Sequence, residues 1–363
     1  MVISRNASVA LDLLRGSAAL TVFIHHCEHH GLDGGLFAWA RGDVGHSAVV
    51  IFFVLSGYVI ASTLSPDATA LDFAIRRMSR IYSVAVPAIV FSWMADLAVS
   101  RIDPALLTHG YQLAKPWIYV GLALTFSGDS WALGESLFSN GAYWSLNYEV
   151  WYYVAFGVFA FARGAWRVVG FLLVLALTGP KLWLLFPIWL GGAMVSRLQQ
   201  VRPLSIGPAR LCVAASIALL WVAKVWQWEQ AINGFMGDLT GGWGGWHMLR
   251  FSQWFLGDHL IGGLTMVLVY ALGSAEFRIP PLLRRPIVGL ASVSFSLYLL
   301  HGPLIVLFES LLPGQGWATI VLTLACSLGL GALIEPQRTR VRRMLNDAAW
   351  RWAPVPHTDR RKD

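Results

Sequence analysis

The sequence predicts an all-α membrane protein in which about ten transmembrane helices form one bundle. Three observations predict this fold class. Hydrophobic residues make up 56% of the 363 residues, charged residues make up only 13%, and the mean hydropathy is +0.58. Apolar stretches long enough to cross a bilayer recur along most of the chain. The positive charges between these stretches are unevenly distributed.

The apolar stretches place the helices along the chain, because each crossing requires about 20 mostly apolar residues. The first span is expected to be retained, since it contains Asp12 and Arg15 and no small-residue cleavage site follows it. Residues 1–336 are interpreted as one transmembrane domain and residues 337–363 as a basic cytoplasmic tail with a disordered end. The expected spans are 9–28, 46–64, 81–99, 144–162, 168–180, 182–196, 211–228, 257–273, 289–309 and 317–334.

The distribution of Lys and Arg orients the bundle. An even number of spans puts both termini on one side, and if that side is the cytoplasm, 20 of the 27 Lys and Arg residues fall on it. This bias predicts that both termini are cytoplasmic. It also accounts for the net charge of +7 without a nucleic-acid partner. The run Trp117–Phe126 is too short for a crossing and is interpreted as a re-entrant or interfacial segment.

Two other features of the sequence do not indicate a specific chemistry. The segment Gly241-Gly-Trp-Gly-Gly-Trp246 is expected outside, either as an aromatic belt at the membrane interface or as a sugar-stacking or lid surface. The cysteines are odd in number and lack metal-ligand spacing, which predicts neither a metal site nor a disulfide framework. They are Cys27, Cys212 and Cys326.

The first span carries Arg15 and His26 on one face. The two residues are separated by about three helical turns, or about 16 Å along the axis. An ionisable side chain inside a membrane needs a polar partner or a polar cavity. Arg15 has a candidate partner in Asp12, one turn away. His26 is either an interfacial histidine, one of four at the end of this span, or a functional group.

Two motifs lie toward the predicted cytoplasmic side. The small step Ser56-Gly57 interrupts bulky residues of the second span, and it either packs neighbouring helices or lines a passage for a thin ligand. Arg76, Arg77 and Arg80 are spaced so that their guanidinium groups converge. They either anchor the helix on the cytoplasmic side or bind a phosphorylated ligand, because guanidinium suits bidentate phosphate recognition.

Polar residues also occur in two later spans. Ser145 and Glu149 are four residues apart on one helix face, and a carboxylate at this depth indicates a functional role or a structural partner. Tyr298 and His301 precede Pro303, and a buried histidine there again requires a polar neighbour.

Taken together, these segments resemble the bacterial acyltransferase-3 family of membrane O-acyltransferases. The resemblance implies an enzyme of the bacterial inner membrane. It also implies transfer of an acyl group, usually acetyl, from cytoplasmic coenzyme A to a hydroxyl of a glycan or lipid-linked sugar beyond the membrane. The family's functional positions correspond here to Arg15, His26, Arg77, Arg80 and Glu149. Five motifs carry it in the family's order: Leu11–His26, Phe52-Phe-Val-Leu-Ser-Gly57, Arg77-Met-Ser-Arg80, Trp144-Ser-Leu-Asn-Tyr-Glu149 and Ser296-Leu-Tyr-Leu-Leu-His-Gly-Pro303.

The chain departs from the family pattern in two respects. The family often has Gly-Val-Asp before the Phe-Phe pair, where this chain has Ala48-Val49-Val50 and therefore lacks the acidic group. Some members carry a further esterase-like soluble domain, for which 363 residues leave no room. The acceptor is therefore expected to reach the membrane domain itself.

The chemistry of a thioester suggests roles for the candidate residues. The enzyme must remove the proton of the attacking hydroxyl and stabilise a tetrahedral oxyanion. His26 is the expected general base because imidazole titrates near neutral pH. Glu149 is expected to orient that histidine, and Arg15 to stabilise charge deeper in the cavity. Direct attack and a covalent acyl-enzyme both remain open.

The placement of the charges suggests a route for the donor. Acetyl-CoA, with its phosphates at Arg76, Arg77 and Arg80, would extend its pantetheine arm past Arg15 and Ser56-Gly57. His26, Glu149 and His301 are expected in the outer half of the membrane. No metal is required by this scheme.

Other functions are compatible with the same buried groups. A transporter or flippase also needs ionisable residues along a pathway, although no inverted repeat or pair of broken helices is evident. A non-catalytic assembly subunit would tolerate loss of His26. Within the enzyme interpretation, the acceptor is either a glycan or a small antibiotic-type molecule.

Overall fold

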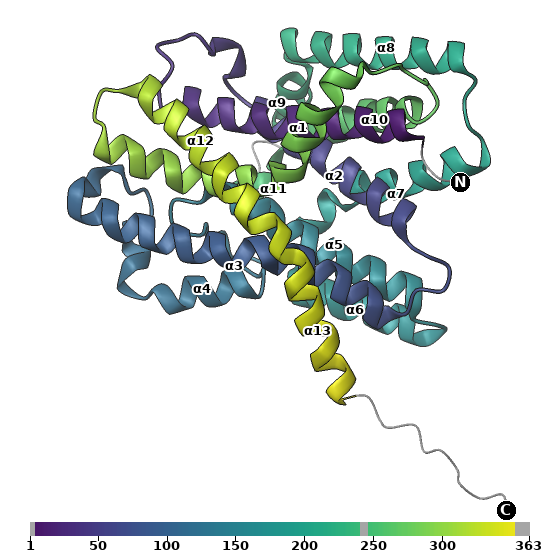
Figure 1. Ribbon diagram of the computed structural model, residues 1–363, viewed down its shortest axis with the longest axis horizontal. Helices are drawn as coiled ribbons and strands as arrows, with labels where there is room; N and C mark the ends of the chain where they lie inside the picture. Colours follow the sequence, from purple (N-terminus) through teal and green to yellow (C-terminus); the bar gives the residue numbers. More distant parts are fainter. Residues whose placement is uncertain (1–3, 240–245, 353–363) are drawn as a thin grey trace, which may run out of the picture.

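The computed structural model describes residues 4–239 and 246–352, and these residues contain helices and no β-strand. Figure 1 shows the helices stacked in layers, with α13 projecting from the body of the molecule. Short 3-10 turns connect several of the helices. The α-helices are α1 Arg5–His29, α2 Val44–Thr63, α3 Ala70–Ile102, α4 Pro116–Leu124, α5 Trp144–Phe161, α6 Ala165–Thr178, α7 Phe186–Val201, α8 Ile206–Val225, α9 Trp228–Leu239, α10 Phe255–Leu272, α11 Pro281–Leu311, α12 Gly316–Ile334 and α13 Arg338–Trp352.

The predicted spans correspond to helices, but the predicted number of crossings is not confirmed. Each of the ten ranges overlaps one α-helix. Among the described residues, seven helical segments are long and apolar enough to cross a membrane. They do not include α6 and α7, which have 14 and 16 residues, or α5, whose first turns carry polar side chains. The seven segments are Arg5–His29, Val44–Thr63, Ala70–Ile102, Ile206–Val225, Leu249–Leu272, Pro281–Leu311 and Gly316–Ala349.

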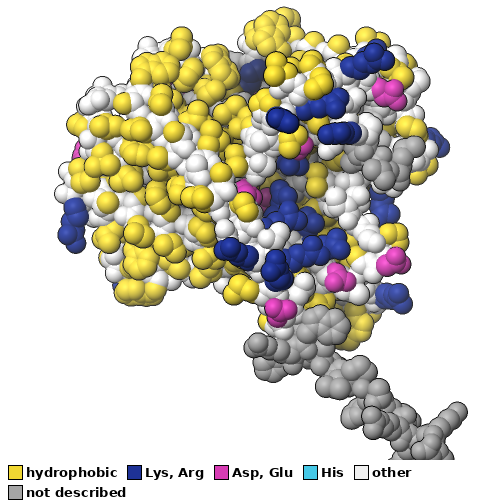
Figure 2. Space-filling view, in the orientation of Figure 1, with side chains coloured by type: hydrophobic (Ala, Val, Ile, Leu, Met, Phe, Trp, Pro, Cys, Tyr) yellow, Lys and Arg dark blue, Asp and Glu magenta, His cyan; other side chains and the backbone are white. Residues whose placement is uncertain are grey.

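The surface agrees with a membrane environment. Large hydrophobic side chains are exposed on several of these helices, and Figure 2 shows hydrophobic side chains over much of one face. Exposed apolar patches of this extent are costly in water and are covered by lipid in membrane proteins. Examples are Leu211 and Trp221 on α8 and Val321 and Leu333 on α12.

Two segments differ from the sequence prediction in length. Helix α3 begins at Ala70 rather than near residue 81, because Thr69 and Asp72 form a reciprocal capping box. The predicted arginine cluster therefore lies within a continuous helix of 33 residues. Helix α4 has nine residues, which confirms that the segment near 117–126 is too short to cross a bilayer.

Helices α2 and α11 occupy the centre of the packing. Helix α2 contacts α1, α7 and α10, and α11 contacts α1, α3 and α12. Helix α5 reaches this centre through α2 and α3. The side chains that α1, α2, α3, α5 and α11 direct inward are therefore close neighbours.

Glycine permits the close crossing of α2 and α7. A Cβ atom on Gly57 would lie 1.9 Å from the carbonyl oxygen of Trp189, and one on Gly192 would lie 2.1 Å from that of Val54. Of the two interpretations of the Ser56-Gly57 step, the structure supports helix packing for Gly57. The expectation that its backbone lines a ligand passage is wrong, since the bare face of Gly57 is directed at α7.

Replacing Gly57 with alanine is expected to destabilise the bundle, because the added methyl overlaps the α7 backbone. Overpacking of this kind costs about 1–3 kcal/mol. Thermal unfolding of purified protein, followed by tryptophan fluorescence, should show a lower Tm for Gly57→Ala. The control is Gly263→Ala on α10, where a Cβ would meet open space. Equal melting temperatures for both variants would contradict the packing argument.

The residues after α12 were expected to form a tail. Residues 338–352 instead form α13, which packs against α3 and follows the 3-10 turn Glu335–Gln337. The segment Gly241–Gly245 and the predicted disordered end, Pro354–Asp363, lie outside the described residues.

Candidate functional site

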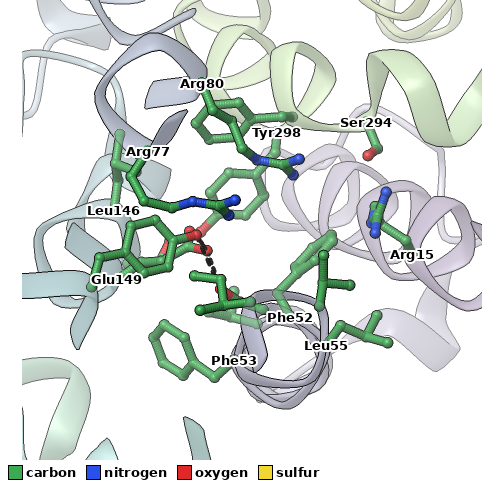
Figure 3. A pocket seen from close by; sticks show the side chains of 17 residues that line it. Arg15, Phe52, Phe53, Leu55, Arg77, Arg80, Leu146, Glu149, Ser294 and Tyr298 are labelled. Atoms are coloured by element: carbon green, nitrogen blue, oxygen red, sulfur yellow. Dashed lines mark hydrogen bonds between the residues drawn. The ribbon is translucent and has the colours of Figure 1, made fainter. Parts of the chain in front are cut away.

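A cavity of about 70 Å³ lies between α1, α2, α3, α5 and α11. We call it the arginine cavity, since three arginines contribute to its wall: Arg15, Arg77 and Arg80. Figure 3 shows Arg77 and Arg80 extending from α3 toward Glu149 and Tyr298, with Arg15 on the other side. The other lining residues are Val49, Phe52, Phe53, Leu55, Ser56, Val59, Ile60, Ser145, Leu146, Tyr153, Ser294 and Phe295.

The carboxylate of Glu149 is held by hydroxyl groups. Ser56 donates to Glu149 Oε1 at 2.5 Å, a contact drawn in Figure 3, and Tyr153 donates to the same oxygen. The indole of Trp189 donates to Ser56 Oγ at 3.1 Å. Sequence analysis did not identify Tyr153 or Trp189. The available signal for Tyr153 was its position four residues after Glu149, on the same helix face.

The arginines of the cavity have few partners. Arg15 pairs with Asp12 at 3.5 Å, which confirms the predicted ion pair. The buried Nε atoms of Arg76 and Arg77 have no hydrogen-bond partner among the described residues. Arg76 does not line this cavity and interacts electrostatically with Asp72 and Arg338. Free guanidinium donors around a narrow cavity can bind an anion.

A second cavity, of about 610 Å³, lies at the other ends of α1 and α2. We call it the histidine cavity, since it is lined by His25, His26 and His46. It shares Val49 and Tyr298 with the arginine cavity, so the two cavities meet at these residues. The other lining residues are Val22, Gly42, Asp43, Gly45, Gly141, Ala142, Trp144, Gln230, Asn233, Gly234, Phe251 and Trp254.

His26 contacts His301, which is fully buried on α11. His301 Nε2 lies 3.2 Å from His26 Nδ1, while His301 Nδ1 lies 3.0 Å from the Leu297 carbonyl. A carbonyl only accepts, so neutral His301 carries its proton on Nδ1 and accepts at Nε2. His26 Nδ1 also lies 2.9 Å from the Val22 carbonyl and therefore carries the proton of that ring. This assignment leaves a lone pair on His26 Nε2.

The junction between the cavities is polar. The Tyr298 hydroxyl donates to the Ala142 carbonyl at 3.0 Å and lies 2.7 Å from Ser145 Oγ. Ser145 and Tyr298, both predicted site residues, are thus brought together across α5 and α11.

The structure does not bring Glu149 and His26 together. Among the described residues, Ser56 and Tyr153 hydrogen-bond to Glu149, whereas His301 and the Val22 carbonyl contact His26. The expectation that Glu149 orients His26 is therefore wrong. The carboxylate of Glu149 lies in the arginine cavity. The side chain that contacts His26 is His301, where a carboxylate was expected.

A network of charged residues lies beside the histidine cavity and was not predicted. His46 lies 3.0 Å from Asp258, and Lys224 pairs with Asp43 and, at 3.7 Å, with Glu229. Burial and the charge of Asp43 raise the pKa of Glu229 to about 8. The available signal was Asp258 itself, an acidic residue inside a predicted span.

These features define a class of protein: a membrane protein of many helices with two adjacent cavities, one lined by arginines and one by histidines. Residues 8–335 match the family described as "Acyltransferase domain", the acyltransferase-3 family. The chain belongs to this family, as the five motifs predicted.

One curated relative gives further detail. An "O-acetyl transferase" of Shigella phage Sf6 is 32% identical over 88 residues, which cover 24% of this chain and 26% of the relative. The chain thus matches about a quarter of that relative's length. No solved structure matches the chain.

Proposed function

We propose that the protein transfers an acyl group, most simply acetyl, from cytoplasmic acyl-CoA to a hydroxyl of an extracytoplasmic glycan or lipid-linked sugar. The family and the O-acetyl transferase relative support O-acyl transfer. The observation that carries the proposal is the meeting of a basic cavity and a histidine cavity at Val49 and Tyr298.

The arginine cavity fits the donor. Coenzyme A carries phosphates on its nucleotide and a thin pantetheine arm that ends in the thioester. Guanidinium groups on α3 suit the phosphates, and a narrow space of about 70 Å³ suits a thin chain. In this proposal Arg77 and Arg80 bind the donor, and the thioester reaches the junction at Tyr298.

The histidine cavity fits the acceptor. Its volume of about 610 Å³ is typical of pockets for small organic molecules. Phe251 and Trp254 contribute aromatic groups to the wall, and Asn233 and Gln230 contribute amide groups. A combination of aromatic faces and hydrogen-bonding groups suits a sugar.

The reaction follows from the tautomer of His26. Nε2 accepts the proton of the acceptor hydroxyl as its oxygen attacks the thioester carbonyl. The tetrahedral oxyanion then collapses and the carbon–sulfur bond breaks. The thiolate of coenzyme A takes the proton from the imidazolium, which restores neutral His26. Arg15 favours the negative charge that develops at oxygen and then at sulfur.

A sidedness assay with labelled acetyl-CoA tests this function. The charge distribution predicts that α3 presents its arginines to the cytoplasm. We expect inside-out membrane vesicles from expressing cells to incorporate the labelled acetyl group and release free thiol. Right-side-out vesicles should do neither, because acetyl-CoA does not cross the membrane.

Vesicles from cells without the gene provide the background. Incorporation confined to right-side-out vesicles would contradict the proposed direction. The absence of gene-dependent thiol release would contradict acyl transfer and favour a transporter, which does not consume acyl-CoA.

A further inference from the structure

Helix α13 presents one arginine to the body of the protein. Arg338, Val341, Leu345 and Ala349 are among the less exposed positions of the helix, recur every three to four residues and form one face. This face packs against α3. Arg340 is about 200° around the helix from Arg338 and is exposed.

Contacts at the start of α13 fix its position. Glu335, in the turn before it, accepts hydrogen bonds from the backbone N–H and the hydroxyl of Ser296 on α11, at 3.3 and 3.1 Å. Helix α13 therefore extends from a turn anchored to the helix that also carries Tyr298 and His301. Its arginines are held at a defined place beside α3.

The arginines of α3 and α13 form one cluster. The charge of Arg338 interacts with those of Arg76, Arg77, Arg80 and Arg342, and Figure 2 shows basic side chains gathered on this face. Carboxylates that interact with this cluster in the described structure are Asp72, Glu149 and Glu335.

The cluster has more positive charge than its neighbours neutralise. Among the described residues, none of these five guanidinium groups forms an ion pair with a carboxylate. Five positive charges face three negative ones, and the buried Nε atoms of Arg76 and Arg77 have no acceptor. Like charges held this close repel one another, so the arrangement favours a bound anion with several negative charges.

We propose that Arg338, with Arg76 and Arg80, forms a phosphate-binding site beside the arginine cavity that takes the phosphorylated nucleotide end of the acyl donor. The inference rests on the proposed function, in which acyl-CoA enters from this side. It gives α13 a role in donor binding. Arg80 lines the cavity and also neighbours Arg338, so a single ligand can contact both.

Binding of adenosine 3′,5′-bisphosphate tests the site, because this probe has nucleotide phosphates without a pantetheine arm. In nanodiscs of zwitterionic lipid, Arg338→Ala should raise the Kd of the probe about 10-fold, because charge-assisted hydrogen bonds are lost. Arg338→Lys should give an intermediate value, since it keeps the charge but not the fork. Arg340→Ala should leave the Kd within about two-fold, and pantetheine binding should not change in any variant.

Anionic lipid is the other source of phosphate. A second set of nanodiscs that contain anionic lipid distinguishes a lipid-binding site from a donor-binding site. An effect of Arg338→Ala seen only in anionic discs would overturn the proposal in favour of a lipid site. Equal probe binding by Arg338→Ala and wild type, with acetyl-CoA still bound, would overturn it while leaving the proposed function intact. Failure of wild-type protein to bind either compound would refute both.

Discussion

Replacing His26 with alanine is expected to lower the rate of acyl transfer by about 10²- to 10⁴-fold, the usual contribution of a general base. The reason is the lone pair left on Nε2 of a histidine that lines a cavity large enough for an acceptor. The measurement is label transfer from acetyl-CoA in inside-out vesicles that contain equal amounts of protein. Expression and membrane insertion should be near normal, because the side chain lies at the end of α1.

His25→Ala is the matched control. His25 lines the same cavity, but its Nδ1 lies 2.9 Å from the Ala40 carbonyl, on the loop after α1, and it does not contact His301 in the described structure. We expect a reduction of less than about ten-fold, well below the contribution of a general base. If His26→Ala kept the wild-type rate and His25→Ala lost it, His25 rather than His26 would be the general base.

The fold was predictable from the sequence where a signal lay within one segment. Long apolar stretches gave helices at the expected places, and the pair formed by Asp12 and Arg15 follows from their three-residue separation. The number of crossings was less predictable, because α6 and α7 are short apolar helices. Hydropathy alone does not say whether such helices cross the membrane or pack partway through it.

The arrangement of the site depends on contacts between distant segments. His26 and His301 are 275 positions apart, and their contact exists because α1 packs along α11. Glu149 was expected beside His26 because both residues were predicted in the outer half of the membrane. Depth leaves the lateral direction of a side chain undetermined, and the packing of α5 against α2 and α3 turns Glu149 toward Ser56 and the arginines.

Conversion of Glu149 to glutamine is expected to slow acyl transfer by about 10- to 100-fold while the protein remains folded. Glu149 is a positioning residue: its carboxylate accepts from Ser56 and Tyr153 and supplies negative charge near Arg77. Hydrogen bonds to a charged group contribute about 1.5–3 kcal/mol, and the neutral amide loses that strength without changing shape. Initial rates at varied acetyl-CoA should show a lower kcat and a changed KM, since the arginines that bind the donor lose their counter-charge. Tyr153→Phe is the control, because it removes the hydroxyl that contacts Glu149 and Ser56 but keeps the carboxylate, so its rate should fall by less than ten-fold. Wild-type turnover in Glu149→Gln would show that the charge of this carboxylate has no part in organising the arginine cavity.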